Sequence, residues 1–193
     1  MRPERVIDAI AAKVDDTTLI CVDASYVTNW VISNIDVPRP GRFILSPRGT
    51  GGIGWALPAA IGAKLGDSGR NVVCVSGDGG FGYVMNELET AARYGVNLLI
   101  VVFNNGTLGF QRHWEEKVMG RYLECDYLDI DHSEVARALK CGGERVKQPD
   151  ELAVAIDRGL AYDGPYLIDA VVDPDATGPI VGFERPVAAG AAH

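Results

Sequence analysis

Short apolar runs alternate with amphipathic segments along the chain. Continuous apolar runs are typical of strands that are buried on both faces. We expect such strands at residues 18–22, 71–76, 97–103 and 166–172, and shorter ones at 43–45 and 144–146. Apolar residues at helical spacing predict helices at residues 3–14, 25–34, 56–65, 84–94, 133–140 and 151–161. This alternation predicts a doubly wound α/β domain, with a mostly parallel sheet and helices on both faces.

Local signals refine the ends of these elements. Pro3 suits the first turn of the first helix, and Ser25 is a candidate cap for the second. The periodicity is lost after residue 173. We therefore expect one domain over residues 1–175 and a C-terminal tail over residues 176–193.

Composition narrows the class of protein. The 193 residues carry a net charge of −8, with a pI of about 4.8, which argues against non-specific binding to nucleic acid. The sequence contains no apolar run near the ~18 residues of a membrane span and no secretory signal at its start, so we expect a cytoplasmic protein. The four cysteines form no CxxC pair, and we interpret them as reduced, small apolar residues: Cys21, Cys74, Cys125 and Cys141.

One glycine motif gives only weak evidence. Residues 49–54 match the G-x-G-x-x-G pattern of dinucleotide-binding proteins. That fingerprint needs a firm preceding strand and a lone acidic residue about 20 positions later. Here the preceding strand is short, and the acidic candidate, Asp78, lies within a glycine cluster. A nicotinamide or flavin enzyme is therefore a distant alternative.

A second glycine motif has more chemical content. Residues 77–80, Gly-Asp-Gly-Gly, follow an apolar strand and precede a helix. Backbone amides in such a turn can face an anion, and Asp78 offers the oxygen ligand that Mg²⁺ prefers. The alternative is a tight turn in which Asp78 only caps the helix.

The next strand ends with two asparagines and a glycine, residues 104–106. Asn105 follows Asp78 by 27 residues, which is one βαβ step, so the two strand ends should lie close together. Asn105 can then offer a side-chain oxygen, and Thr107 a backbone carbonyl, to the same metal. With two diphosphate oxygens and a water, they would complete an octahedral Mg²⁺ shell. A plain turn would account for the asparagines alone but not for their pairing with the acidic glycine turn.

Together these motifs resemble the thiamine-diphosphate (ThDP) binding motif. The wider chain, from about residue 23 to about residue 172, resembles the C-terminal domain of the acetolactate synthase family. The resemblance is carried by residues 51–60, 77–81, 87–91 and 104–109, and by Trp114.

The resemblance implies roles for individual residues. Asp78, Asn105 and the carbonyl of Thr107 would bind Mg²⁺, and the backbone amides of Gly79, Gly80 and residues 107–109 would hold the diphosphate. Ile53 would be the apolar wedge that bends the cofactor, and the carbonyl of Gly51 would accept a hydrogen bond from its 4′-amino group. The implied cofactor-binding set is Gly51, Gly52, Ile53, Gly77, Asp78, Gly79, Gly80, Asn105, Thr107, Leu108 and Gly109.

The resemblance also implies a substrate channel at Phe110, Gln111 and Trp114. For Ile53 and Trp114 the competing interpretation is core packing. Ile53 and Phe110 stand where synthases of the family usually carry methionine, which leaves the substrate open. The catalytic glutamate of the family belongs to a second ThDP-binding domain, and no residue here takes that role; we expect Glu87 and Glu89 to pack or pair.

The sequence therefore predicts the diphosphate- and Mg²⁺-binding part of an acetolactate synthase-like decarboxylase or carboligase acting on a 2-oxo acid. Its expected partner is a second, pyrimidine-binding domain or subunit with the catalytic glutamate, in an oligomer. Alternatives are the β subunit of a split sulfopyruvate-type decarboxylase and a non-catalytic cofactor-binding assembly subunit. A natural subunit is slightly favoured over a fragment of a longer synthase.

Overall fold

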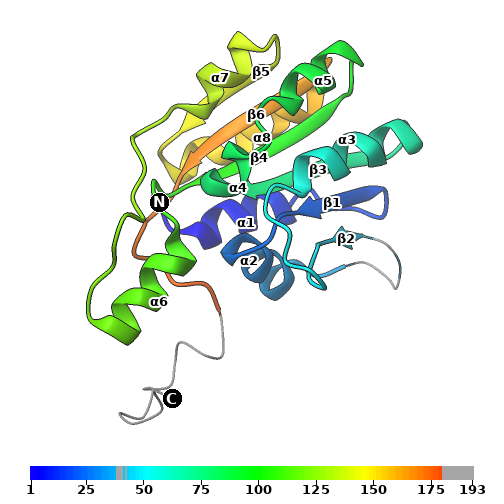
Figure 1. Cartoon of the computed structure of the whole chain (residues 1–193). Coiled ribbons are helices and arrows are strands. Elements are labelled where there is room, and N and C mark those ends of the chain that lie inside the picture. Colours follow the sequence, from blue (N-terminus) through cyan, green and yellow to red (C-terminus); the bar gives the residue numbers. More distant parts are fainter. Residues whose placement is uncertain (38–40, 42, 180–193) are drawn as a thin grey trace.

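The computed structural model describes residues 1–37, 41 and 43–179. Its centre is a parallel sheet of six strands in the order β2-β1-β3-β4-β6-β5 (Figure 1). The strands are β1 (Thr18–Val22), β2 (Ile44–Leu45), β3 (Asn71–Gly77), β4 (Leu98–Asn104), β5 (Gly142–Val146) and β6 (Pro165–Val171). The six predicted strands are confirmed.

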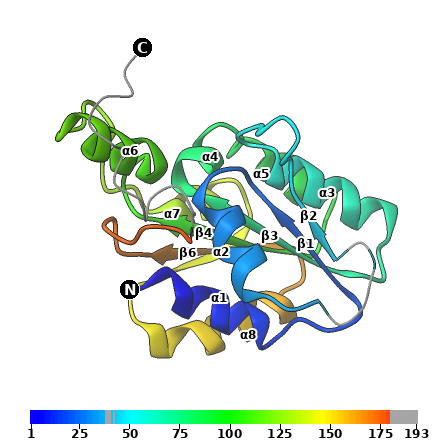
Figure 2. The ribbon, with the colours of Figure 1, turned by 90° about the horizontal axis from the view of Figure 1, so that it is seen from below.

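Helices cover both faces of this sheet, so the predicted doubly wound α/β fold is also confirmed. Helices α1, α2 and α8 pack on one face, and α3, α5 and α7 on the other (Figure 2). The helices are α1 (Pro3–Ala11), α2 (Tyr26–Asn34), α3 (Ala56–Gly66), α4 (Asp78–Gly82), α5 (Glu87–Arg93), α6 (Gly109–Met119), α7 (His132–Ala138) and α8 (Leu152–Ala161), with a 3₁₀ turn η1 at Pro149–Glu151.

The strands read as continuous apolar runs because both of their faces are buried. In β1, Ile20 and Val22 join the core under α1, α2 and α8, whereas Leu19 and Cys21 join the core under α3 and α5. All residues of β4 are buried. Each buried Val, Leu or Ile side chain of this kind contributes roughly 1.5–3 kcal/mol to folding.

The strand order places a crevice beside the ends of β1 and β3. From β1 the chain moves outward to β2 and then returns to the other side of β1 as β3. Ligands of open α/β sheets bind where the order reverses in this way, outside the carboxyl ends of the strands. Gly77 of β3 pairs with Phe103 of β4, so the loops after these two strands are neighbours, as predicted.

Three local predictions need correction. Ser25 occupies the N-cap position of α2, but its side chain makes no capping hydrogen bond, because its backbone takes φ 78° and ψ −155°. The helix predicted at 84–94 begins only at Glu87, after a series of turns. Helix α6 was not predicted; it lies beyond the carboxyl ends of the strands (Figure 1).

The first residues of the expected tail pack on the domain. Ala176 is buried in the core that includes α1 and α2. Gly178 lies so close to Tyr26 that an added Cβ would stand 2.6 Å from its Cδ1. The boundary at residue 175 stays a prediction, and residues 180–193 lie outside the described part of the chain.

Candidate functional site

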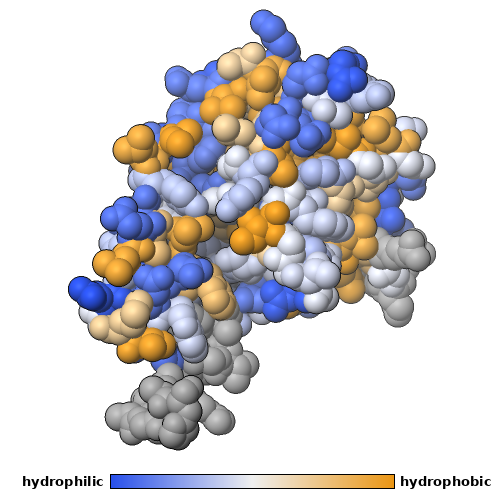
Figure 3. Space-filling model, viewed as in Figure 1, coloured by the Kyte–Doolittle hydropathy of each residue, from blue (hydrophilic) through white to orange (hydrophobic). Residues whose placement is uncertain are grey.

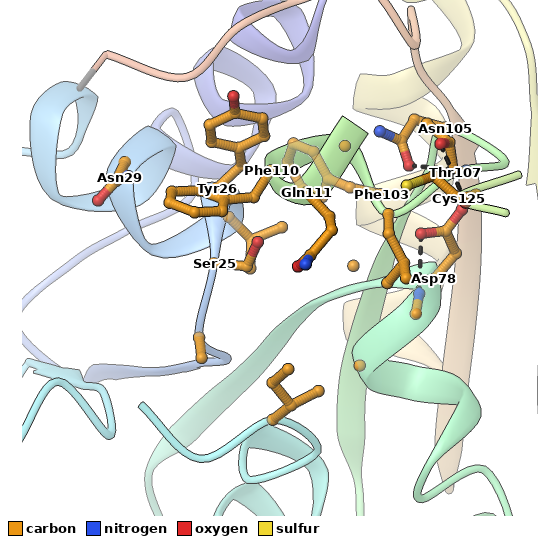
Figure 4. Close-up of a pocket in the computed structure, with 18 of the residues that line it drawn as sticks. Ser25, Tyr26, Asn29, Asp78, Phe103, Asn105, Thr107, Phe110, Gln111 and Cys125 are labelled. Atoms are coloured by element: carbon orange, nitrogen blue, oxygen red, sulfur yellow. Dashed lines mark hydrogen bonds between the residues drawn. The ribbon is translucent and has the colours of Figure 1, made fainter. Parts of the chain in front are cut away.

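A cavity of about 1150 Å³ opens at the carboxyl ends of β1, β3 and β4. Its walls contain most of the predicted site residues: Gly51, Ile53, Gly77, Asp78, Gly79, Gly80, Asn105, Thr107, Leu108, Gly109, Phe110 and Gln111. Gly52 and Trp114 do not line it. Asp78, Asn105 and Thr107 lie on one side of the cavity and Ser25 and Tyr26 on the other, with Gln111 between them (Figure 4). The structure thus gathers residues that are far apart in the sequence.

Asp78 is the buried acid of the cavity. Helix α4 begins at this residue, so Asp78 is not its cap, and the capping interpretation is wrong. One carboxylate oxygen accepts a hydrogen bond from the amide of Gly79 (2.8 Å), and the other from the amide of Gly106 (2.7 Å), across to the neighbouring loop. Burial raises the pKa of Asp78 to about 6, against the opposing effect of these hydrogen bonds and of nearby His132.

Asn105 and Thr107 meet Asp78 at one point. The terminal side-chain atom of Asn105 that faces the site lies 2.8 Å from the Thr107 carbonyl oxygen. The same atom lies 3.2 and 3.3 Å from the two carboxylate oxygens of Asp78. If this atom is the amide nitrogen, it donates hydrogen bonds to these oxygens. If it is the amide oxygen, Asn105, Thr107 and Asp78 each direct an oxygen to the same point.

This spacing fits a small hard cation. Mg²⁺ binds oxygens at about 2.0–2.1 Å in octahedral geometry, so neighbouring ligands lie about 2.9 Å apart. The chemistry of the donors also fits, since a carboxylate, an amide and a backbone carbonyl are all oxygen ligands. Among the described residues, no group of three or more His, Cys, Asp and Glu side chains gathers to hold a metal ion. The mixed oxygen set is therefore the candidate metal site.

The segment after α6 supports the loop that carries Thr107. The Leu108 amide donates to the carbonyl of Cys125 (2.8 Å), and the Tyr127 amide donates to the carbonyl of Gly106 (2.8 Å). The Thr107 hydroxyl also donates to the Cys125 carbonyl, at 3.1 Å. These bonds fix the direction of the loop and with it the direction of the Thr107 carbonyl.

Two glycines of the site are required by close packing. A Cβ on Gly80 would stand 2.5 Å from a carboxylate oxygen of Asp23, and one on Gly109 would stand 2.7 Å from the side-chain nitrogen of Asn105. Any larger residue would therefore displace Asp23 or Asn105. Part of the glycine pattern thus reflects packing of the chain against itself within the site.

Asp23 lies next to the site, at a predicted strand end, but the sequence assigned it no role. It follows β1, is 1% exposed, and accepts hydrogen bonds from the amides of Gly54 and Trp55 and from the hydroxyl of Ser76. It therefore joins the loop that carries Ile53 to the end of β3. The only sequence signal was its place at a strand end, because its partners are mostly backbone amides.

The predicted wedge residue and the apolar residues predicted for the substrate channel lie on the surface. Ile53 is 56% exposed and Trp114 46% exposed, so the core-packing interpretation is wrong for both. Phe110 packs its ring at a tilt against Tyr26, with centroids 5.5 Å apart. Over the end of the molecule where α6 lies, hydrophobic residues lie among hydrophilic ones (Figure 3).

Three glutamates near the site can be placed relative to the cavity. Glu115 lines the cavity, but its carboxylate accepts a hydrogen bond from the amide of Leu123 (3.0 Å). Glu89 pairs with Arg93 one turn later in α5, as expected. Glu87 lies in the same helix and is not part of the cavity wall.

Two broader expectations can be compared with the structure. The four cysteines are buried and free, in agreement with their interpretation as small apolar residues. Within the described part of the chain, no helix has the length and apolar character needed to cross a membrane.

Comparisons with known proteins point to one enzyme family. A family profile described as "thiamine pyrophosphate enzyme, C-terminal TPP binding domain" matches residues 23–170. The probable acetolactate synthase large subunit of Methanococcus aeolicus is 30% identical over 183 residues, which are 91% of this chain and 30% of the relative. The acetolactate synthase isozyme 2 large subunit of Escherichia coli K12 is 35% identical over 157 residues, 80% of this chain and 28% of the relative.

A solved structure is similar over most of the chain. The thiamine diphosphate-dependent 4-hydroxybenzoylformate decarboxylase of Rhodococcus jostii RHA1 superposes with a TM-score of 0.81 at 28% identity. The match covers 90% of this chain and 32% of that protein. The chain thus spans about a third of the length of the proteins that it matches.

Proposed function

The chain belongs to the thiamine pyrophosphate enzyme family, as its C-terminal TPP-binding domain, and we propose that it holds the diphosphate and Mg²⁺ of ThDP in an acetolactate synthase-like enzyme. The reaction would be decarboxylation of a 2-oxo acid, or its ligation to a second carbonyl compound. The bound cofactor supplies the nucleophilic carbon and the electron sink for this chemistry, while the protein binds and orients it.

The convergence of Asp78, Asn105 and Thr107 is the observation that carries the proposal. With the Asn105 amide turned so that its oxygen faces the site, this oxygen would lie 2.8 Å from the Thr107 carbonyl and 3.2 and 3.3 Å from the Asp78 carboxylate oxygens, close to the spacing of adjacent ligands of one Mg²⁺ ion. Asp78 would provide the negative charge, and the Asn105 amide and the Thr107 carbonyl would provide neutral oxygens. Positions left open on the metal are suited to two diphosphate oxygens and a water.

The charges in the cavity wall support a role for the metal. Among the described lining residues, Arg48 is the only cation, whereas Asp78, Glu115, Glu124 and Asp173 are acids. An anionic diphosphate would be repelled from such a wall unless a divalent cation offsets the negative charge. The backbone amides of Gly80 and of the first turn of α6 would complete the grip, whereas those of Gly79, Leu108 and Gly109 already donate to oxygens of the protein.

The remaining lining residues fit the expected cofactor and substrate contacts. The exposed side chain of Ile53 is available as the wedge beneath the cofactor. The Gly51 carbonyl would accept a hydrogen bond from the 4′-amino group of the cofactor. Phe110 and Gln111 would contact the 2-oxo acid. Glu115 is engaged with the Leu123 amide. We propose that a second domain or subunit supplies the glutamate that exchanges a proton with the pyrimidine ring, within an oligomer.

Calorimetric titration of the chain with ThDP, with and without Mg²⁺, tests the proposal. We expect binding only with the metal, and at least about a tenfold loss of affinity in Asp78→Asn and Asn105→Ala, the size of a lost charge-assisted contact. Asp15→Asn is the matched control, because Asp15 is also hydrogen-bonded but lies at the amino end of β1, whereas the site lies at the carboxyl ends of the strands. Equal affinity of all four proteins would refute the proposal.

A further inference from the structure

Directly behind the proposed metal site lies a buried polar network. Asp169, on β6, is fully buried. One of its carboxylate oxygens lies 3.3 Å from the Asn104 amide nitrogen, 3.3 Å from Nε of Arg145 and 3.2 Å from the backbone nitrogen of His132. Its other oxygen lies 3.4 Å from Nδ1 of His132. One carboxylate thus gathers an amide, a guanidinium and an imidazole inside the fold.

The network contacts the neighbours of two proposed metal ligands, Asn105 and Asp78. On one side, Asn104 immediately precedes Asn105, and its side chain also donates to the carbonyl of Ile130 (2.9 Å). On the other side, the ring of His132 stands edge-on to Phe81, at 85° and 5.4 Å between centroids. Phe81 is buried within α4, the helix that begins at Asp78.

The same network secures the segment that supports Thr107. Residues 126–131 run from the bridge between Asp126 and Thr107 to the start of α7. Arg145, which lies beside Asp169, also pairs with Asp129 in the middle of this segment. The segment is therefore held at Asp126, Asp129 and Ile130, and a change at Asp169 would reach the Thr107 loop from behind.

We propose that Asp169 and His132 are positioning residues that set the affinity of the site for its divalent cation. This inference rests on the proposed function, and it adds two residues that touch neither metal nor cofactor. Burial of a carboxylate costs several kcal/mol of folding free energy, so stability alone would favour apolar side chains at this place. Partners that orient metal ligands typically change metal affinity by about 10–100-fold when they are removed.

The test separates positioning from stability. Two variants remove the network's contacts with little change in volume: Asp169→Asn, and His132→Phe, which keeps a ring against Phe81. Thr18→Val is the matched control. Thr18 is also buried and makes two side-chain hydrogen bonds with Asp15, but at the opposite end of the sheet. The metal affinity is measured with Mn²⁺ by electron paramagnetic resonance at saturating ThDP, and ThDP affinity by calorimetry at saturating Mg²⁺.

We expect Mn²⁺ to bind about 10–100-fold more weakly to both network variants, while excess Mg²⁺ restores ThDP affinity to within about threefold of wild type. Thr18→Val should lose stability towards urea but keep its Mn²⁺ affinity. If Asp169→Asn does not fold, His132→Phe alone decides. Mn²⁺ affinities that match the control overturn this inference only, whereas a wild-type chain that binds no ThDP with metal overturns the proposed function as well.

Discussion

The carboxylate of Asp23 accepts hydrogen bonds from the backbone amide of Gly54, at 3.1 Å to one oxygen and 3.0 Å to the other. The same carboxylate accepts from the hydroxyl of Ser76 (3.1 Å) and from the amide of Trp55 (3.3 Å). A single buried charge therefore ties the loop bearing Ile53 to the ends of β1 and β3. The wedge and the phosphate turn of the proposed cofactor site share this anchor.

Replacement of Asp23 by Asn should loosen that loop. The amide would keep the shape but bring an N–H group against donors, so we expect a loss of roughly 1–3 kcal/mol in the free energy of unfolding. Urea denaturation measures this loss, and amide hydrogen exchange at Gly54 and Trp55 locates it. The exposed Asp163→Asn is the control, with an expected change within about 0.5 kcal/mol. Unchanged protection of Gly54 would contradict the anchoring role.

A methyl group on Gly80 should strain the same anchor. In Gly80→Ala the new Cβ would stand 2.5 Å from an Asp23 oxygen that is fixed by its own hydrogen bonds. We expect a destabilisation of about 1–3 kcal/mol, as for other overpacked sites. Gly82→Ala in the same helix meets nothing within 4 Å and should gain up to about 1 kcal/mol. Equal stability of the two variants in urea would show that Asp23 can move aside.

The sequence predicted the sheet because β1, β3, β4 and β6 are apolar on both faces, a pattern that short strands show when helices cover the sheet on both sides. It also predicted that Asp78, Asn105 and Thr107 meet, since adjacent parallel strands end side by side. Their roles towards metal and cofactor stay predictions.

Other features depend on contacts that no local pattern records. Asp23 acts through amides 31 and 32 positions away, and Asp169 lies on β6, which pairs directly with β4 although β5 comes first in the sequence. Helix α6 did have a signal, because Phe110, Trp114 and Val118 recur every four residues. These side chains are 41%, 46% and 54% exposed, so the stripe is not part of the buried core from which a helix is usually predicted.

The cysteines should resist alkylation in the folded protein. Burial raises the pKa of Cys21 and of Cys141 to about 11, and it raises that of Cys74 well above the usual value of a thiol. The thiolate is the reactive form, so at pH 8 a thiol with this pKa is only about one part in a thousand ionised. Mass spectrometry after iodoacetamide treatment should find these three unmodified in buffer and modified in urea. Rapid labelling of Cys74 in buffer would mean that the sheet opens readily.

Ser25 should store strain beside the cavity that a glycine would release. Its backbone, at φ 78° and ψ −155°, lies in a region that is almost exclusive to glycine and costs other residues about 1–3 kcal/mol. Glycine itself lowers the free energy of unfolding by roughly 0.5–1 kcal/mol, because it gives the unfolded chain greater conformational freedom. We therefore expect Ser25→Gly to raise the free energy of unfolding by about 0.5–2 kcal/mol in urea.

Ser25→Ala separates the backbone from the hydroxyl. Alanine keeps the Cβ that makes this conformation costly, and the serine side chain makes no capping hydrogen bond that could be lost. Its stability should therefore stay within about 0.5 kcal/mol of wild type. If Ser25→Gly were instead less stable than wild type, the conformation of this residue would have to be supported by contacts of its side chain. An equal gain in both variants would place the cost in the hydroxyl and not in the backbone.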